Sequence, residues 1–291
     1  MKLGLFAINY GTCADPETCI KVATHAEAAG FESVWTGEHV VLPDPMPDRL
    51  PFRADLPFLD TTVALTLAAT HTTTLKVASG IIILPLHSPV LLAKRLASID
   101  VVSHGRLIVG VGAGYIREEF QAVSVPFASR QERMDEFIQA LRALWTMDRP
   151  RFRGRHVSFE GIDAHPRPAQ RPFPPVVVGG EGRGALTRAA TVANGWYGFS
   201  LDVAGARHFT DTLRQLQIEY GRPAELGALE ITVTPSGPLD RSVVAQYEEL
   251  GVDRLVLLPR PDAAGAERHR PVPLDRILAN IDWAAGELLP R

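Results

Sequence analysis

The stretch "RLIVGVGAGYIREEF", residues 106–120, carries glycines at alternate positions, Gly110, Gly112 and Gly114. The dinucleotide fingerprint G-x-G-x-x-G needs a further glycine three positions on, where this chain has tyrosine or arginine. The stretch therefore predicts an apolar strand that ends in backbone with few side chains. Two interpretations stay open: the glycines leave room for packing inside a barrel, or they let a flat or anionic ligand approach the main chain.

Short apolar runs alternate with amphipathic segments along the whole chain. Eight runs have the length and composition of strands: 2–8, 33–36, 75–83, 106–112, 175–179, 195–199, 228–234 and 253–258. This alternation predicts a parallel sheet, either doubly wound or closed into a barrel. Eight repeats without a dinucleotide fingerprint favour one α/β domain over residues 1–291, a (β/α)8 TIM barrel with insertion loops.

Helix boundaries are marked by capping residues. Asp15, followed by proline, predicts the start of the first helix, and Gly30 predicts its end. Ser129 and Glu132 have the spacing of a capping box before another helix. Further helical segments are expected at 89–104, 183–193, 202–219, 240–250 and 273–288. The four tryptophans are expected in the core.

Two proline-rich insertions, residues 40–60 and 152–175, interrupt the alternation and are not expected to be helical. The first follows the second strand, which places it on the catalytic face of a barrel. We expect Val40 to Leu59 to be mobile without ligand and to close over a substrate.

The composition is typical of a globular protein, with 46% hydrophobic and 22% charged residues. A formal charge of -3 gives no electrostatic case for binding nucleic acid or an anionic membrane. The first apolar run is expected to be a core strand rather than a signal peptide. Cys13 and Cys19, the two cysteines, cannot form a zinc cluster or a disulfide framework, and a reducing cytoplasm is the expected setting.

Barrel active sites collect at the carboxyl ends of the strands. Lysines are missing from the predicted ends, which argues against Schiff-base chemistry. A metal-dependent hydrolase would need several converging ligands, and only Glu38, His39 and Asp60 are candidates, so no metal site is predicted. His39 is the best titratable candidate, with Glu38 expected to point the other way, and His87 is interpreted as a structural or substrate-loop residue.

A second glycine-rich turn, "GGEGRGALTRAA", begins at Gly179 and runs directly into a helix. Free backbone N–H groups and the positive end of the helix then face the same point, which predicts an anion site. A flexible turn is the alternative. Together with the first glycine stretch, this site is typical of a flat ring that carries a phosphate tail.

These pieces also carry a family resemblance. The segments "HAEAAGFESVWTGEHVVLP", "LKVASGIIILPLHSPVLLAKRLASIDVVSHGRLIVGVGAGYIREEF", "RMDEFIQALRALW" and "PPVVVGGEGRGALTRAATVANGWYGF" resemble the bacterial luciferase-like monooxygenase superfamily. The chain most resembles the branch that uses the deazaflavin coenzyme F420. The resemblance implies a barrel, a homodimer, and hydride transfer between F420 and a small organic substrate.

Carried over to this sequence, the resemblance implies that His39 lies beside the (deaza)flavin ring, where it is also the catalytic acid or base. The other implied cofactor-binding residues are Ser79, Gly80, Ile81, Gly112, Ala113, Gly114, Tyr115, Gly179 and Gly180. Arg183 is expected either to assist the phosphate turn or to face solvent. The Gly80–Ile81 peptide bond is expected to be cis, in a bulge behind the ring.

Two other functions stay open. One is an FMN-dependent monooxygenase, in which reduced flavin reacts with oxygen. The other is a catalytically silent flavin-binding or structural barrel.

Overall fold

Eight parallel strands close into a barrel in the computed structural model, which describes residues 1–48, 50, 53–259 and 271–289. The barrel strands are β1 (Lys2–Phe6), β2 (Ser33–Thr36), β3 (Lys76–Ser79), β5 (Leu107–Gly112), β8 (Val176–Gly179), β9 (Gly195–Leu201), β10 (Glu230–Pro235) and β11 (Arg254–Leu257). They pair in the order β3-β2-β1-β11-β10-β9-β8-β5, and pairing of β3 with β5 closes the ring. The predicted (β/α)8 barrel is confirmed.

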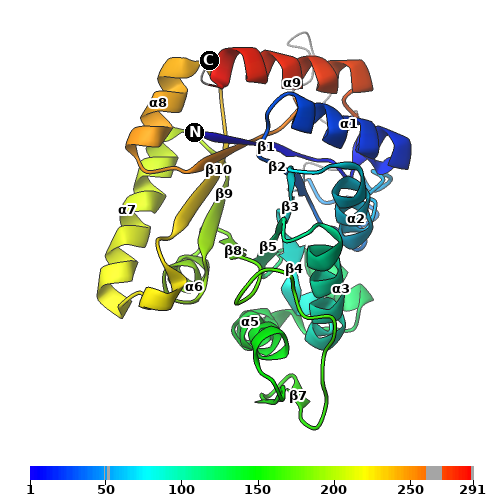
Figure 1. Cartoon of the computed structure of the whole chain (residues 1–291), viewed down its shortest axis with the longest axis vertical. Coiled ribbons are helices and arrows are strands. Elements are labelled where there is room, and N and C mark those ends of the chain that lie inside the picture. The colour runs from blue at the N-terminus through cyan, green and yellow to red at the C-terminus, as the bar shows by residue number, and fades with distance from the viewer. Residues whose placement is uncertain (49, 51–52, 260–270, 290–291) are drawn as a thin grey trace.

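Helices surround the barrel (Figure 1). They are α1 (Pro16–Ala28), α2 (Thr61–His71), α3 (Pro89–Val102), α4 (Arg117–Ala122), α5 (Arg130–Thr146), α6 (Arg183–Val192), α7 (Val203–Tyr220), α8 (Arg241–Glu249) and α9 (Leu274–Leu288). Short 3-10 helices cover Gly11–Ala14, Leu84–Leu86, Phe127–Ser129 and Ala224–Leu226. Within the described ranges, none of the helices has the length and apolar character that crossing a membrane requires.

The predicted strand 75–83 is interrupted. β3 ends at Ser79, and β4 (Ile82–Ile83) resumes the pairing with β5. From Ala78 to Ile82 the first strand advances four positions, whereas β5 advances three, from Ile108 to Val111. The extra residue makes a bulge. The Gly80–Ile81 peptide bond inside it is cis, as predicted.

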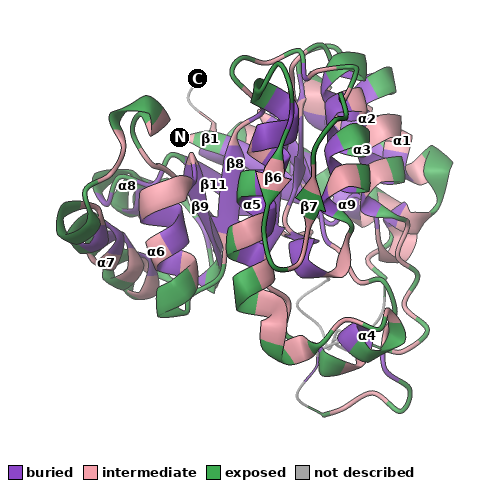
Figure 2. Cartoon of the chain, turned by 90° about the horizontal axis from the view of Figure 1, so that it is seen from below, coloured by how far each residue is buried: buried purple, intermediate pink, exposed green. Residues whose placement is uncertain are grey.

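Strand side chains alternate between two apolar clusters, as the pleat of a strand requires. On β1, Leu3 and Leu5 pack into the large cluster between strands and helices, whereas Phe6 packs into a smaller one inside the barrel with Trp35 and Tyr197. Buried residues line the strands, and exposed residues lie on the outer faces of the helices (Figure 2). Three tryptophans are buried as predicted, but Trp283 on α9 is 42% exposed.

The predicted helix boundaries are partly confirmed. The Asp15 side chain accepts the amide of Thr18, and Gly30 has a φ of +88°, in the left-handed region that glycine tolerates. The capping box at Ser129 is wrong. The preceding 3-10 helix runs straight into α5, so Ser129 has helical backbone, and its hydroxyl donates to the carbonyl of Pro126 instead.

Helix α2 was not predicted, because "TTVALTLAATH" is rich in threonine and apolar all round, without an amphipathic pattern. Its N-cap is Asp60, whose carboxylate accepts the amides of Thr62 and Val63. The candidate metal ligand Asp60 is therefore a helix cap. In the part of the chain that the structure describes, no group of three His, Cys, Asp or Glu side chains is placed to hold a metal ion.

Neither insertion contains an α-helix among its described residues. The second forms a short antiparallel hairpin of β6 (Phe152–Arg153) and β7 (Ser158–Phe159). In the first, residues 49, 51 and 52 lie outside the described residues. Its mobility and closure stay predictions.

One carboxylate ties α1 to the segment before β3. Glu27 Oε1 accepts the amides of Thr73, Thr74 and Leu75 at 2.8, 2.6 and 2.9 Å. Burial opposes ionisation of Glu27, but these hydrogen bonds outweigh it and lower the pKa from 4.5 to about 2. Because the folded-state pKa is depressed, the stabilisation is present above about pH 4.5 and is lost as the pH falls towards 2.

Replacing Glu27 by glutamine is expected to lower the free energy of unfolding by about 1–3 kcal/mol at pH 7, since hydrogen bonds to a charged acceptor are weakened. Urea unfolding at pH 7 and at pH 3 measures the difference, which should shrink at the lower pH. Glu249→Gln, at an exposed position of α8, is the control and should change stability little. An equal effect of both variants would contradict the assignment.

Candidate active site

A cavity of about 980 Å³ opens at the carboxyl ends of the barrel strands. Nine of the ten predicted site residues line it: His39, Gly80, Ile81, Gly112, Ala113, Gly114, Tyr115, Gly179 and Gly180. They come from segments far apart in the sequence that the closed barrel brings to one rim. Ser79 is the exception, because it is fully buried in the wall.

The glycines of the strand ends are needed first for packing. A β-carbon at Gly110 would lie 1.8 Å from the Ser79 carbonyl oxygen. β-Carbons at Gly112 and Gly179 would lie 2.6 and 2.8 Å from side-chain carbons of Ile81. The Ser79 hydroxyl also donates to the Gly110 carbonyl at 2.8 Å and accepts its amide at 2.9 Å. The packing interpretation is therefore correct for these glycines, because they make room for the bulge that carries Ile81 to the cavity.

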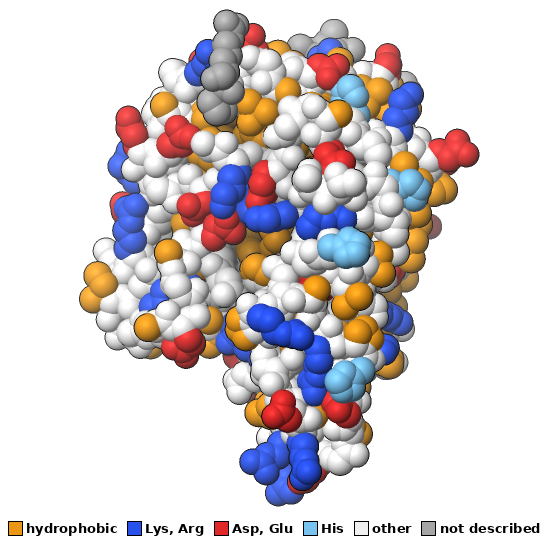
Figure 3. Space-filling model, in the orientation of Figure 1, with side chains coloured by type: hydrophobic (Ala, Val, Ile, Leu, Met, Phe, Trp, Pro, Cys, Tyr) orange, Lys and Arg blue, Asp and Glu red, His pale blue; other side chains and the backbone are white. Residues whose placement is uncertain are grey.

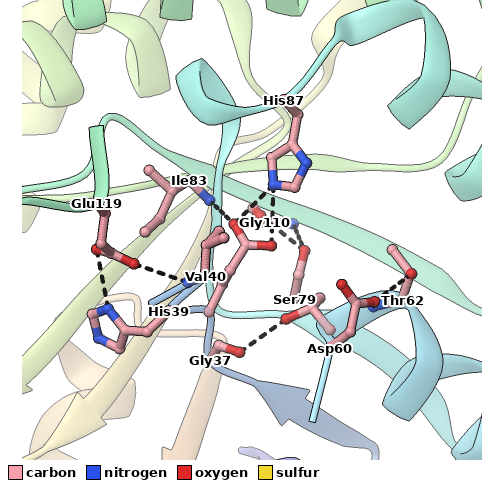
Figure 4. A network of polar contacts seen from close by, with 12 residues as sticks. Gly37, His39, Val40, Asp60, Thr62, Ser79, Ile83, His87, Gly110 and Glu119 are labelled. Carbon is pink, nitrogen blue, oxygen red and sulfur yellow. Dashed lines mark hydrogen bonds and ion pairs between the residues drawn. The ribbon is translucent and has the colours of Figure 1, made fainter. Parts of the chain in front are cut away.

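His39 is held by a buried carboxylate. Its Nδ1 lies 3.2 Å from Glu119 Oε2, and Glu119 Oε1 accepts the amide of Val40 at 2.9 Å (Figure 4). Glu119 is fully buried on α4. The rings of Phe58 and Tyr115 stand edge-on to the imidazole, with centroids 5.2 and 6.1 Å away. These contacts fix the position of the ring and assign Nδ1 to the carboxylate.

Glu38, the neighbour of His39, makes contacts in a different direction. Its carboxylate accepts the amide of Ile83 at 2.6 Å and lies 3.0 Å from Nε2 of His87. Burial works against a charge on His87, but the Glu38 carboxylate outweighs it and raises the pKa of His87. The pair joins the end of β2 to the segment after β4, which supports the structural interpretation of His87.

The second glycine turn leads into α6. Gly180 has a φ of +119°, and its carbonyl accepts the indole N–H of Trp196 at 2.8 Å. Gly182 is the N-cap residue of α6, and both Gly182 and Gly184 line the cavity. The first amides of a helix have no acceptor within it, so this turn presents donors and the positive helix end to the cavity.

Two arginines of α6 differ in placement. Arg183 is 70% exposed and pairs with Glu219 at 3.2 Å, so of the two expectations for it the solvent-facing one is correct. Arg188 lines the cavity with 8% of its surface exposed, and it contacts Asp135 and Gln131 of α5.

Sequence reasoning missed three residues here: Glu119, Gln131 and Arg188. Glu119 lies in "REEF", shortly after the glycine stretch. Two acidic residues this close to a strand end were the signal that could have identified it. Gln131 and Arg188 reach the cavity only because α5 and α6 pack beside each other at its rim, which periodicity does not reveal.

Comparison with known proteins supports one family. A model of the family described as luciferase-like monooxygenase matches residues 1–239. An uncharacterised protein of Mycobacterium tuberculosis H37Rv is 31% identical over 246 residues, 81% of this chain and 85% of that one. The FMNH(2)-dependent dimethylsulfone monooxygenase of Pseudomonas putida is 35% identical over 164 residues, 55% of this chain and 44% of the relative.

Solved structures share the fold at lower identity. An F420-dependent secondary alcohol dehydrogenase in complex with an F420–acetone adduct has a TM-score of 0.77 at 15% identity and covers 98% of this chain and 97% of its own. The monooxygenase RslO1 from Streptomyces bottropensis has a TM-score of 0.77 at 19% identity, with coverage of 100% and 99%. With the family match over most of its length, this chain belongs to the luciferase-like monooxygenase family.

Proposed function

We propose that the protein transfers a hydride between coenzyme F420 and a small organic substrate inside this cavity. One observation carries the proposal: a single cavity joins a glycine turn at a helix N-terminus to a histidine held by a buried carboxylate. The turn suits the phosphate of a cofactor, and the histidine suits proton transfer to or from a substrate.

The residues present fit such a cofactor. A β-carbon at Gly182 would meet no atom within 4 Å, so open space lies over the first turn of α6. In our proposal the backbone from Gly179 to Gly184 holds the phosphate, with Arg188 as the nearby cation. Ile81, on its bulge, supports the back of the ring. When bound there, a deazaflavin supplies a carbon that accepts or returns a hydride.

His39 handles the proton in this proposal. Removing a hydride from an alcohol carbon leaves a hydroxyl proton that must pass to a base, and reducing a ketone needs the same proton back. Because Nδ1 of His39 contacts Glu119, Nε2 is the nitrogen that exchanges this proton with the substrate in our proposal. The His39–Glu119 pair is therefore suited to a reaction that moves one proton with each hydride.

The second candidate is an FMN-dependent monooxygenase, favoured by the 35% identity to the dimethylsulfone enzyme over about half the chain. A catalytically silent barrel is the third. The homodimer that the resemblance implies and the cytoplasmic location stay predictions.

Titration of the purified protein with F420 and with FMN, each oxidised and reduced, separates these functions. The proposal expects saturable binding of F420, seen as a change in its absorbance, and its reduction by members of a panel of alcohols. Turnover only with reduced FMN and oxygen would establish the monooxygenase. Saturable binding of neither would favour the silent barrel.

Gly182→Val tests the phosphate turn. The backbone at this position, with φ −69° and ψ 150°, accepts any residue, unlike that of Gly180. The valine side chain would fill the space over α6, so the Kd for the cofactor is expected to rise about 10- to 100-fold. Valine at a helix cap costs about 1 kcal/mol of stability, which leaves the barrel folded.

Gly286→Val, at an exposed position of α9 with no atom within 4 Å of its β-carbon, is the matched control and should bind the cofactor normally. Gly180→Val should weaken binding too, but its positive φ adds backbone strain. Fluorescence titration gives the Kd values, and thermal unfolding checks the fold. Unchanged affinity in Gly182→Val would move the phosphate elsewhere.

A further inference from the structure

Four aromatic side chains stand side by side along one wall of the cavity: Phe58, Tyr10, Phe6 and Phe199. Successive ring centroids are 4.9, 6.1 and 5.4 Å apart. The first ring, Phe58, also lies 5.2 Å from the ring of His39. We call these four residues the aromatic wall. It forms a continuous row that starts at His39.

The rings of the aromatic wall lie at different depths, with Phe58 and Tyr10 half-buried. Phe6 is 6% exposed, whereas Phe199 is 44% exposed although it belongs to the otherwise largely buried strand β9. A large aromatic side chain at the wall of a cavity offers its face or edge to a ligand ring. The wall therefore offers contact surface to a ligand ring in the cavity.

The aromatic wall provides no charge. Burial raises the pKa of the Tyr10 hydroxyl above its usual range, so this hydroxyl stays neutral at pH 7. Among the described lining residues, the acidic and basic side chains besides His39 belong to Glu38, Arg53 and Arg188, and none of these is part of the wall. Glu38 and Arg53 contact His87 and Asp55, and in our proposal Arg188 serves the phosphate turn. A charged ligand group on the wall would lose its water without gaining a counter-charge, which is costly.

We infer that the aromatic wall binds the ring of an uncharged substrate, aromatic or alicyclic, that presents a hydroxyl or carbonyl group to His39. This substrate class rests on the proposed function. Ring-to-ring contact supplies affinity along the wall. The position of Phe58 next to His39 places the polar group of such a molecule at the imidazole.

The probes are acetophenone, acetone, and 4-acetylbenzoate, which adds a carboxylate to the same ring ketone. Calorimetric titration of the full-length protein without cofactor is expected to give acetophenone a Kd at least about tenfold lower than that of acetone. The carboxylate is expected to abolish this gain. The same titration with saturating F420 should still show acetophenone binding.

Phe199→Ala should weaken acetophenone binding about five- to tenfold and leave acetone binding unchanged. Phe199→Leu keeps much of the volume without the ring and should recover only part of the loss. Trp283→Ala, an aromatic position of similar exposure on α9, is the control and should bind like the original protein.

Equal affinity for acetone and acetophenone, equal affinity for the carboxylate, or unchanged binding in Phe199→Ala would each overturn the inference. Loss of acetophenone binding when F420 saturates the protein would also overturn it, because the wall would then hold the cofactor. Failure of the proposed function is distinguishable. The protein would then bind no F420, while the titrations without cofactor would still decide whether the wall binds an uncharged ring.

Discussion

His39→Ala is expected to bind F420 within about threefold of the original protein and to lose about 100- to 10,000-fold in kcat. The imidazole is held at the cavity by Glu119 and by the edges of two aromatic rings, so it is already oriented to exchange a proton. Removing it takes away the acid or base but leaves the glycine turn intact. Affinity and turnover should therefore separate.

Stopped-flow absorbance of F420 with small alcohols, ketones and enones measures turnover, and equilibrium titration measures affinity. His71→Ala, at an exposed position of α2, is the control and should keep full turnover. Full turnover in His39→Ala would make His39 a structural residue.

Glu119→Gln tests whether the Glu119 carboxylate orients the His39 imidazole or only fills the space beside it. The amide oxygen of glutamine can still accept the Val40 N–H, but its NH2 group can only donate to Nδ1 of His39. The favoured tautomer then changes, and Nε2 carries the proton that it should accept. We expect kcat to fall at least about tenfold with a displaced pH profile, while KM changes little. A drop in stability with an unchanged pH profile would indicate packing alone.

The sequence predicted the barrel well because each strand is a short, mostly buried run, and parallel barrel strands differ clearly from the segments between them. It failed at α2, whose threonine-rich, evenly apolar sequence lacks the period of a surface helix. It also failed at Ser129, where the right spacing coincides with backbone that is already helical. Local sequence patterns identify most helices and strands, but they do not show the backbone conformation of the residues that lead into them.

The same limit applies to the site. Nine predicted residues reach one cavity because strand ends converge in any barrel of this kind. Glu119 was missed because its role depends on His39, 80 positions earlier. The alternate glycines led to residues that line the cavity, but the reason was incomplete, since Gly110 and Gly112 first accommodate Ser79 and Ile81.

At the opposite end of the barrel, Arg254→Met is expected to lower the free energy of unfolding by about 3–5 kcal/mol. The Arg254 side chain is fully buried, with its guanidinium 2.8 and 3.0 Å from the two carboxylate oxygens of Glu32 and 3.1 Å from Glu230. It also donates to the Thr232 hydroxyl at 2.9 Å and lies 5.6 Å from the Trp35 ring. Each of the three guanidinium nitrogens therefore donates at least one hydrogen bond.

Acidic and basic side chains gather beside one another near the middle of the face in Figure 3. The described pairs at the amino ends of the strands include Lys2 with Glu230 and Lys76 with Glu32. When Arg254 is removed, these exposed lysines would still provide positive charge next to the Glu230 and Glu32 carboxylates. We therefore expect a loss of stability near the lower end of the range. Arg254→Lys keeps the charge but not the forked geometry, and it should cost less.

The pH dependence provides a second measurement of the same cluster. Burial opposes ionisation of Glu32, but Arg254 outweighs it and lowers the pKa from 4.5 to about 2. The stabilisation from Glu32 is therefore present above about pH 4.5 and disappears as the pH falls towards 2, and Arg254→Met should flatten this dependence. Urea unfolding between pH 7 and pH 3 measures both effects, with Arg153→Met, 91% exposed, as the control. A loss below about 1 kcal/mol at pH 7 would mean that the cost of burying the Arg254 charge nearly cancels its pairing, and that the cluster specifies the arrangement of β2, β10 and β11 rather than stabilising it.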